Sequence, residues 1–418
     1  MEQRLKRIAV IGAGPIGLEA ALESGRRGHE VSIYESGRVG EHFRRYGDVV
    51  LFTPFRMNST ELGRTRLAAQ GVPVPSPDAL LSARDFAARY LEPLARLPEL
   101  AGAIREGTRV TQVAREGLRK PEGIAAVGDR SRSVHPFLLR IEAREGTRFE
   151  RADVVLDASG VYGTPNATGP GGLPAAGEER LDDRIERHLP SILGEARHRY
   201  AGQRVLLIGD GASAATALVA LQQLEADPRA AATVHWVLPR RAGDPFPQDP
   251  QDLLPARRRL AELANAAAGS EGWLTRYPGA MVLSYDRVPG GAIRVRLADP
   301  DGAERSIDVD RVLALVGYRP DTSLTRELHM HLCYASEGPM ALASAILSAS
   351  LENPGAAADC LSQRSHGAET LRNPEPGLFV LGAKSYGRNP NFLLAIGHEQ
   401  IRDVLDVVGA EAGVDAPA

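Results

Sequence analysis

Cysteine is nearly missing from this sequence, which has only Cys333 and Cys360 in 418 residues. Two cysteines cannot build a disulfide framework, and their wide separation does not match the spacing of a zinc site. We therefore expect no metal centre. A chain that does not depend on disulfides is typical of a reducing compartment, so we expect a cytoplasmic protein.

An excess of charge of one sign is also missing. The chain has 50 Lys+Arg against 53 Asp+Glu, a formal net charge of -3. A nucleic-acid-binding protein would carry a clustered basic excess, so we expect no nucleic-acid partner. No apolar run approaches the roughly 20 residues that cross a bilayer, so we expect no membrane partner. The length allows two domains with well-buried cores.

Two glycine-rich turns are the most informative motifs that the sequence does contain. The first is Gly12-Ala13-Gly14-Pro15-Ile16-Gly17, and the second is Gly209-Asp210-Gly211-Ala212-Ser213-Ala214. Each follows an apolar run that is typical of a strand and precedes a segment with helical character. In that context a glycine turn predicts a dinucleotide site. Two such turns predict two nucleotide cofactors that meet in one active site.

The first turn has the features of an FAD site. Gly12 allows the tight turn, Gly14 lets the backbone approach a pyrophosphate, and Gly17 permits close packing of helix and strand. The helix that opens at Pro15 offers free N–H groups to the phosphates. Glu35 ends the second expected strand, where its carboxylate can accept hydrogen bonds from both ribose hydroxyls. FAD is assigned here by analogy, because large flavoproteins commonly open with it. The alternative is a fortuitous glycine-rich turn.

The second turn repeats this pattern with Gly209, Gly211 and Ala214, and Ser213 adds a hydroxyl at the helix start. No acid follows the next strand. The residues there are Arg240 and Arg241, and guanidinium groups suit a 2′-phosphate because they make paired charge-assisted hydrogen bonds. NADPH is therefore favoured over NADH. The alternative is that the two arginines form a solvated charged pair.

Together these features predict an α/β fold with two Rossmann-like dinucleotide-binding domains of the three-layer ββα type. The NADPH domain is expected as an insertion in the FAD domain. We expect FAD-binding parts at residues 1–163 and 318–410, the NAD(P)H-binding domain at residues 164–317, and a tail at residues 411–418. The last helix is expected over residues 392–408.

A redox dithiol is not visible. Thioredoxin-reductase-like enzymes use the same two-domain architecture but need a cysteine pair to carry electrons from flavin to substrate. Cys333 and Cys360 both lie outside the two nucleotide-binding units. Each is better explained as a small buried residue, although Cys360 sits in a loop-like region and could line a pocket. The sequence therefore disfavours dithiol chemistry.

Residues 51–60 (Leu-Phe-Thr-Pro-Phe-Arg-Met-Asn-Ser-Thr), Val72–Pro75 and the helical stretch Phe86–Arg96 resemble flavin-containing monooxygenases. The family's asparagine matches Asn58. The resemblance implies that its amide lies beside the flavin and helps to hold NADP⁺ and a C4a-hydroperoxide. The alternative is a turn or helix-cap residue before Ser59.

Further strings resemble a bacterial branch of these flavoproteins, which includes monooxygenase-like and thioredoxin-reductase-like proteins. They are residues 157–165, with Ser159 and Gly160, residues 315–321, and residues 377–388 followed by 392–394. The resemblance implies that Gly382, Asn391 and Phe392 face the flavin. One family motif is incomplete, because only His188 remains of the fingerprint that should precede the second turn.

These observations favour an FAD-dependent, NADPH-using monooxygenase. It would oxygenate a small-molecule soft nucleophile (sulfur, nitrogen or a metalloid) with molecular oxygen through a C4a-(hydro)peroxyflavin. The alternative is an NAD(P)H-dependent flavoprotein reductase or dehydrogenase with a non-oxygen acceptor. A non-catalytic nucleotide-binding protein is a third hypothesis. His42 is a candidate proton donor because histidine titrates near physiological pH. A homodimer is possible through the Ala/Ser/Leu-rich stretch 332–365.

Overall fold

The structure, a computed structural model, describes residues 5–123, 131–225, 227, 229–239, 243–249, 252–352 and 365–414. The chain divides into two compact units. Unit 1 comprises Met1–Arg44, Thr53–Thr164 and Arg319–Ala418, and unit 2 comprises Arg45–Phe52 and Pro165–Tyr318. The segment Arg45–Phe52, which we expected within the first domain, therefore groups with the inserted one.

A five-stranded parallel sheet forms the centre of unit 1, in the order β16-β7-β1-β2-β3. Its strands are β1 (Arg7–Ile11), β2 (Glu30–Tyr34), β3 (Ile104–Arg105), β7 (Val154–Asp157) and β16 (Leu378–Val380). Strands β7 and β16 are buried along their whole length, which is typical of a parallel sheet that is covered on both faces. The chain leaves β1 for β2 on one side, and β7 pairs with β1 on the other. The carboxyl ends of β1 and β7 therefore form a topological switch point, where open α/β sheets bind their ligands.

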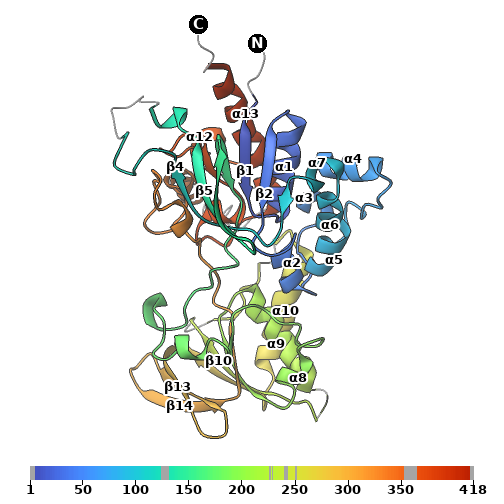
Figure 1. The fold of residues 1–418 in the computed structure, drawn as a ribbon. Coiled ribbons are helices and arrows are strands. Elements are labelled where there is room, and N and C mark those ends of the chain that lie inside the picture. The colour runs from blue at the N-terminus through green and yellow to red at the C-terminus, as the bar shows by residue number, and fades with distance from the viewer. Residues whose placement is uncertain are drawn as a thin grey trace. The chain divides into compact units, whose positions relative to one another are not determined.

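Two further layers cover this sheet. Helices α1 (Pro15–Arg26) and α13 (Leu394–Val414) pack against each other, and Figure 1 shows them side by side. An antiparallel meander of β4 (Arg109–Arg115), β5 (Phe137–Ala143) and β6 (Gly146–Ala152) contributes Phe137, Leu139 and Ile141 to a buried cluster with Ile11 of β1. The expected three-layer ββα arrangement is confirmed. Helix α13 continues to Val414, beyond the expected end at 408, so the described part of the expected tail is helical.

The remaining helices of unit 1 are α2 (Glu41–Tyr46), α3 (Phe55–Asn58), α4 (Glu61–Ala69), α5 (Ala83–Phe86), α6 (Glu92–Ala95), α7 (Pro98–Ala101), α11 (Met340–Glu352) and α12 (Ala368–Leu371). The π-helical segment Ala87–Leu91 joins α5 and α6 without a break. Helix α2 crosses the boundary between the units in the chain. A buried carboxylate fastens α4 to α1, because Glu19 of α1 accepts hydrogen bonds from the Thr60 hydroxyl at 2.7 Å and from the Tyr90 hydroxyl.

Unit 2 repeats the architecture. Its parallel sheet has the order β11-β10-β9-β15-β8. The strands are β8 (Ile185–Glu186), β9 (Arg204–Ile208), β10 (Thr233–Leu238), β11 (Leu274–Pro278) and β15 (Arg311–Ala314). The meander consists of β12 (Met281–Arg287), β13 (Ile293–Ala298) and β14 (Glu304–Val309), and the helices are α8 (Arg197–Tyr200), α9 (Ala212–Glu225) and α10 (Pro255–Gly269). Helices α9 and α10 pack together, and one buried cluster joins them to Trp236 of β10.

The chain passes between the units four times, and the last two passages, at residues 164–165 and 318–319, pair with each other. Arg319 donates its backbone N–H to Thr164 at 3.0 Å, and Asn166 donates to Gly317 at 3.0 Å. None of the helices in the described part of the chain is long and apolar enough to span a membrane.

Candidate functional site

The first glycine turn lies between β1 and α1, and two of its glycines are required by close contacts. Gly12 has φ +100°, and a Cβ there would lie 2.8 Å from the carbonyl oxygen of Ala158. A Cβ on Gly17 would collide with the carbonyl oxygen of Gly12. Gly14 differs, because a Cβ there would meet nothing within 4 Å. The packing of the protein does not explain Gly14, whereas the approach of a diphosphate to the backbone does.

Glu35 follows β2 and is bound to this turn. Its two carboxylate oxygens accept the backbone N–H of Ala13 and of Gly37, each at 2.8 Å. A carboxylate has about four acceptor positions, so Glu35 retains acceptor capacity for ribose hydroxyls. Pro15 is the first residue of α1, and its missing N–H is one that a helix start does not use. The turn, the helix start and the acid are thus assembled as an adenosine diphosphate site requires.

The second turn, between β9 and α9, has the same geometry. Gly209 has φ +123°, and a Cβ there would collide with the carbonyl oxygen of Leu315, while a Cβ on Gly211 would meet nothing within 4 Å. Ala214, in the place of the third glycine, is fully buried. The indole of Trp236 donates to the carbonyl oxygen of Gly209 at 2.8 Å and braces the turn.

Ser213, at the start of α9, interacts with a tyrosine side chain. Tyr46, from the segment that joins unit 2, is hydrogen-bonded to Ser213. Burial raises the pKa of Tyr46, and the bond to Ser213 only partly offsets this. The hydroxyl that the sequence assigned to phosphate binding therefore already has a protein partner.

Each unit has an arginine–aspartate pair at the amino ends of its sheet strands, which confirms that the two units are structural repeats. Arg7 at the start of β1 binds Asp153 with its backbone N–H at 2.8 Å and its Nη2 at 2.7 Å. Arg204 at the start of β9 binds Asp310 in the same way, at 2.9 Å and 2.7 Å. The chain therefore contains the same β-turn-α scaffold twice, each with one glycine turn at the carboxyl edge of its sheet.

Of the residues assigned from the later family strings, Gly382 and Phe392 lie beside the first turn of α1, and Asn391 is exposed. Gly382 has φ +72°, and a Cβ there would lie 3.2 Å from Ile16 in the first turn of α1. A Cβ on Gly397 would collide with Ile16 and lie 2.9 Å from Phe392, so Phe392 also lies beside the first turn of α1. Asn391 is exposed, and its backbone N–H bonds the side chain of Asn389 at 3.0 Å.

A charged pair beside the first turn was missed by the sequence analysis. Lys384 donates to Asp157 Oδ2 at 2.7 Å and to Ser159 Oγ at 3.1 Å. Asp157 Oδ1 also accepts the hydroxyl and the backbone N–H of Ser159, at 2.6 Å and 3.1 Å. Ser159 was predicted as a cofactor residue, and Gly160 next to it has φ +72° with open space around a Cβ. Lys384 stood in a quoted family string, but no spacing rule linked it to Asp157.

The two candidate catalytic residues lie in separate local structures. Asn58 is buried at the end of α3, where its Nδ2 donates to the Thr53 carbonyl oxygen at 2.9 Å and its Oδ1 accepts the Thr53 hydroxyl at 2.7 Å. Asn58 therefore closes its own turn, as the alternative interpretation expected. His42 lies half-buried on α2, with its ring centroid 5.2 Å from that of Tyr162.

Three residues named by the sequence analysis, Arg240, Arg241 and Cys360, lie outside the described residues. Cys333 is a free cysteine on the loop before α11. Hydrogen bonds from Ser336 and the backbone of Ala335 lower the pKa of the Cys333 thiol. Within the described ranges no group of three or more His, Cys, Asp or Glu is placed to hold a metal ion.

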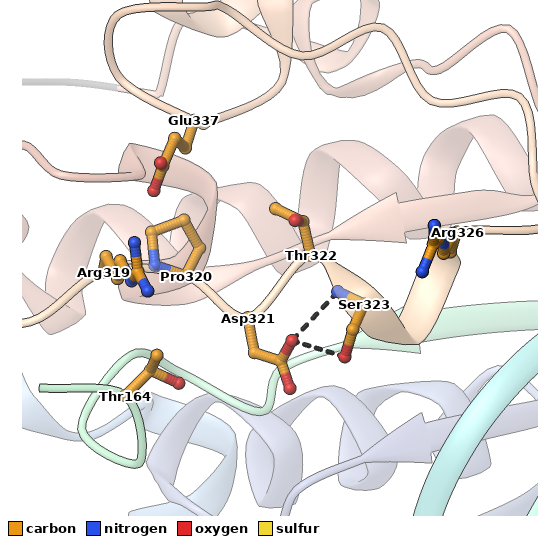
Figure 2. Close-up of a pocket in the computed structure, with 8 residues that line it drawn as sticks. All are labelled: Thr164, Arg319, Pro320, Asp321, Thr322, Ser323, Arg326 and Glu337. Atoms are coloured by element: carbon orange, nitrogen blue, oxygen red, sulfur yellow. Dashed lines mark hydrogen bonds between the residues drawn. The ribbon is translucent and has the colours of Figure 1, made fainter. Parts of the chain in front are cut away.

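Unit 1 also contains a polar cavity of about 430 Å³ where the chain returns from unit 2. Figure 2 shows its lining residues, Thr164, Arg319, Pro320, Asp321, Thr322, Ser323, Arg326 and Glu337. Burial raises the pKa of Asp321, but hydrogen bonds from Ser323 and the charge of Lys384 outweigh it and leave the pKa below its ordinary value. Two arginines and two acids, Arg319, Arg326, Asp321 and Glu337, give the lining charges of both signs.

Comparison with known proteins identifies the fold. Residues 9–120 match the family model of the pyridine nucleotide-disulphide oxidoreductases. A stretch of 35 residues is 54% identical to kynurenine 3-monooxygenase of Neurospora crassa and covers 8% of this chain and 7% of that protein. The chain thus matches only a small part of that curated relative.

Solved structures match over almost the whole chain. A bacillithiol disulfide reductase from Bacillus cereus has a TM-score of 0.68 at 17% identity, covering 98% of this chain and 100% of its own. An ornithine N-hydroxylase from Kutzneria sp. 744 has a TM-score of 0.63 at 16% identity, with the same coverage. A thioredoxin reductase from T. acidophilum has a TM-score of 0.59 at 15% identity, covering 98% of this chain and 99% of its own. This chain therefore has the fold that these reductases and monooxygenases share.

The expected resemblance to flavoproteins with two dinucleotide-binding domains is confirmed. The ornithine N-hydroxylase structure contains FAD and NADP⁺, and the similar structures include oxidoreductases of the class expected from the sequence.

Proposed function

We propose that this protein is an FAD-dependent, NADPH-using monooxygenase that oxygenates a small-molecule soft nucleophile, with sulfur, nitrogen or a metalloid as the reacting atom. The observation that carries the proposal is the repeated glycine turn. In both turns the first glycine is required by close contact with neighbouring backbone, while the middle glycine faces open space. That combination supports a bound diphosphate at each turn.

The two turns take different cofactors in this proposal. FAD belongs to unit 1, where Glu35 holds the turn and retains acceptor capacity for the ribose. NADPH belongs to unit 2, where the sequence places Arg240 and Arg241 after β10. FAD would supply hydride acceptance and oxygen activation. The protein would supply binding and orientation, with Gly382 and Phe392 beside the first turn of α1.

The small number of cysteines favours monooxygenase activity over disulfide reduction. A dithiol reductase needs two thiols near its flavin, and Cys333 is the single cysteine in the described part of the chain. The fold supports either activity, because the similar structures include an N-hydroxylase and disulfide reductases. Asn58 and His42 remain the proposed catalytic residues.

A second function is favoured by one specific observation. Both polar atoms of the Asn58 amide are bound to Thr53, which weakens its assignment to oxygen chemistry. The alternative is therefore an NAD(P)H-dependent flavoprotein reductase or dehydrogenase whose acceptor is not oxygen.

The test separates these two functions in one cuvette. The purified protein is reduced with NADPH without oxygen, and oxygen is then admitted while the flavin spectrum and hydrogen peroxide are followed, with sulfides, amines or arsenite added in turn. We expect a transient spectrum distinct from oxidised and reduced flavin, and one oxygen atom transferred per NADPH for at least one compound class. Immediate reoxidation with one peroxide per NADPH for every compound would overturn the monooxygenase and leave the reductase.

The nucleotide preference has its own test. The double variant R240Q/R241Q should raise the KM for NADPH and leave the KM for NADH unchanged, because only NADPH carries the 2′-phosphate. The matched control is R258Q/R259Q, which makes the same charge change at two exposed neighbours on α10. Equal effects of the two double variants, or equal use of NADH and NADPH by the wild type, would remove the 2′-phosphate assignment.

A further inference from the structure

The buried pair of Lys384 and Asp157 is unusual for the place that it occupies. The side chain of Lys384 is 6% exposed and that of Asp157 is 1% exposed, and their charged atoms lie 2.7 Å apart. A buried ion pair is weak evidence for stability, because the loss of hydration can exceed the attraction between the charges. The stability of the fold therefore does not by itself explain a buried pair at the carboxyl edge of the sheet.

The pair lies at the switch point of the unit 1 sheet. Asp157 is the last residue of β7 and is paired in register with Ile11, the last residue of β1. Ser159 is in contact with the glycine turn itself, because a Cβ on Gly12 would lie 3.1 Å from Ser159 Cα. Lys384 is bound to Ser159 Oγ at 3.1 Å. Ser159 therefore lies between the ammonium group of Lys384 and the glycine turn that is proposed to bind the FAD diphosphate.

Unit 2 shows that the scaffold does not need a charge at this position. Ala314 ends β15 and pairs with Ile208, the last residue of β9, as Asp157 pairs with Ile11. Ala314 is buried, and the second glycine turn still forms with the same geometry beside it. The charged pair thus belongs to one copy of the repeat only, the copy that is proposed to bind FAD.

Lys384 is held rigidly and has a donor to spare. It lies on the 3₁₀ turn Gly382–Tyr386, where Gln400 accepts the Gly382 N–H at 2.9 Å and donates to Ser385 at 2.9 Å. An ammonium group has three N–H donors. Among the described residues Asp157 and Ser159 accept two of them. A third donor in a side chain that is nearly fully buried points to an acceptor supplied by a ligand.

We propose that Lys384, positioned by Asp157 and Ser159, is the cation that binds the diphosphate of the FAD. This inference rests on the assignment of FAD to unit 1. Asp157 accepts both Ser159 donors at Oδ1 and the ammonium group at Oδ2, and so fixes the direction of the ammonium group. The third N–H of Lys384 is available to a phosphate oxygen. Lys384 is a cofactor-binding residue in this proposal, and Asp157 is a positioning residue.

The experiment measures binding to the full chain after its flavin has been removed. Dissociation constants are obtained for FAD, for ADP and for adenosine, in the wild type and in the double variant K384Q/D157N. The double variant is used because K384Q alone would leave the buried Asp157 unpaired. Loss of a charge-assisted hydrogen bond should weaken FAD and ADP binding by about ten- to a hundredfold, and adenosine, which has no phosphate, should bind unchanged.

The matched control is R7Q/D153N. It removes another arginine- or lysine-to-aspartate ion pair of the same sheet, at the amino ends of β1 and β7. Thermal unfolding of the flavin-free proteins is measured alongside, for K384Q as well as for the two double variants. A low melting temperature of K384Q that the added D157N restores shows that the double variant is folded and fit for the binding measurement.

The outcomes are distinct. Weaker FAD and ADP binding in K384Q/D157N but not in R7Q/D153N supports the proposal. Wild-type affinity for FAD and ADP in a stable K384Q/D157N overturns it and leaves the pair as a structural link between β7 and the 3₁₀ turn. Equal loss of adenosine binding would overturn it as well, because the effect would not follow the phosphates. A wild-type chain that binds neither FAD nor ADP would instead refute the proposed function itself.

Discussion

The substitution Gly14→Ala tests the first nucleotide site most directly. Gly14 caps the N-terminus of α1 with φ −79° and ψ −176°, an extended conformation that any residue adopts. A Cβ there would meet no protein atom within 4 Å. The methyl group would occupy only the space above the turn, where a diphosphate would approach the backbone.

The expected change in stability is small because two effects offset each other. Alanine is a poorer helix cap than glycine by roughly 0.5–1 kcal/mol. It also reduces the freedom of the unfolded chain, which stabilises the fold by about 0.4–1 kcal/mol. The free energy of unfolding of the flavin-free protein should therefore stay within about 0.5 kcal/mol of the wild type. Gly17→Ala should not fold, since its Cβ collides with Gly12.

The assay is titration of flavin-free protein with FAD, followed by flavin fluorescence, with thermal unfolding as the check on folding. We expect Gly14→Ala to raise the Kd for FAD at least tenfold, which corresponds to about 1.4 kcal/mol. The control is Gly25→Ala, near the other end of α1, where a Cβ also meets nothing within 4 Å. That variant should gain up to about 1 kcal/mol from helix propensity and bind FAD normally. Wild-type FAD affinity in a folded Gly14→Ala would refute the placement of the diphosphate.

Three further predictions concern buried groups. Glu375 is fully buried between Arg115 and Arg132, so Glu375→Gln should cost about 3–5 kcal/mol of unfolding free energy at pH 7. Burial raises the pKa of Glu375, but hydrogen bonds from Arg132 and Arg115 outweigh it and leave the pKa lowered. The deficit should therefore shrink when denaturation is repeated at lower pH, and a constant deficit would contradict the ion-pair origin. Burial lowers the pKa of His398 to about 3, below its value in the unfolded chain, so only the unfolded chain gains this proton as the pH falls below about 6.5. The unfolding free energy of His398→Phe, relative to that of the wild type, should therefore rise by about 2 kcal/mol between pH 7.5 and pH 5; a difference independent of pH would refute this origin. Asn58→Ala should lose about 1–3 kcal/mol of stability and, in the FAD-loaded enzyme, divert more NADPH to hydrogen peroxide; an unchanged peroxide yield would assign Asn58 to its turn alone.

The part of the site that the sequence predicted well consists of local backbone geometry. Gly12 and Gly209 were assigned as turn residues, and both have positive φ and press against a neighbouring strand end. Glu35 was placed at the end of the second strand, and it is bound to the turn. These features follow from residues that are close in the sequence, because a strand, a turn and a helix start specify their own conformation through glycine freedom and free N–H groups.

The part that the sequence did not predict depends on residues that are distant along the chain. Lys384 meets Asp157 only because β16 is placed beside β7. Tyr46 reaches Ser213 because the segment Arg45–Phe52 groups with unit 2. Asn58 resembled a family residue by its sequence context, yet its amide is used within its own turn. Side-chain partners of this kind have no spacing rule, so no pattern in one sequence announces them.

The sequence by itself determined that this chain folds as two α/β units, each with a glycine turn between a strand and a helix, since apolar runs and glycine turns act through local backbone conformation. It also excluded a disulfide framework, since two cysteines cannot form one. Only the tertiary structure decided which of the two repeats carries a buried charge. Asp157 and Ala314 end equivalent strands, and only the addition of β16 to one sheet brings a lysine to the carboxylate. The attraction between two charges depends on their distance in space and on their burial, and folding sets both.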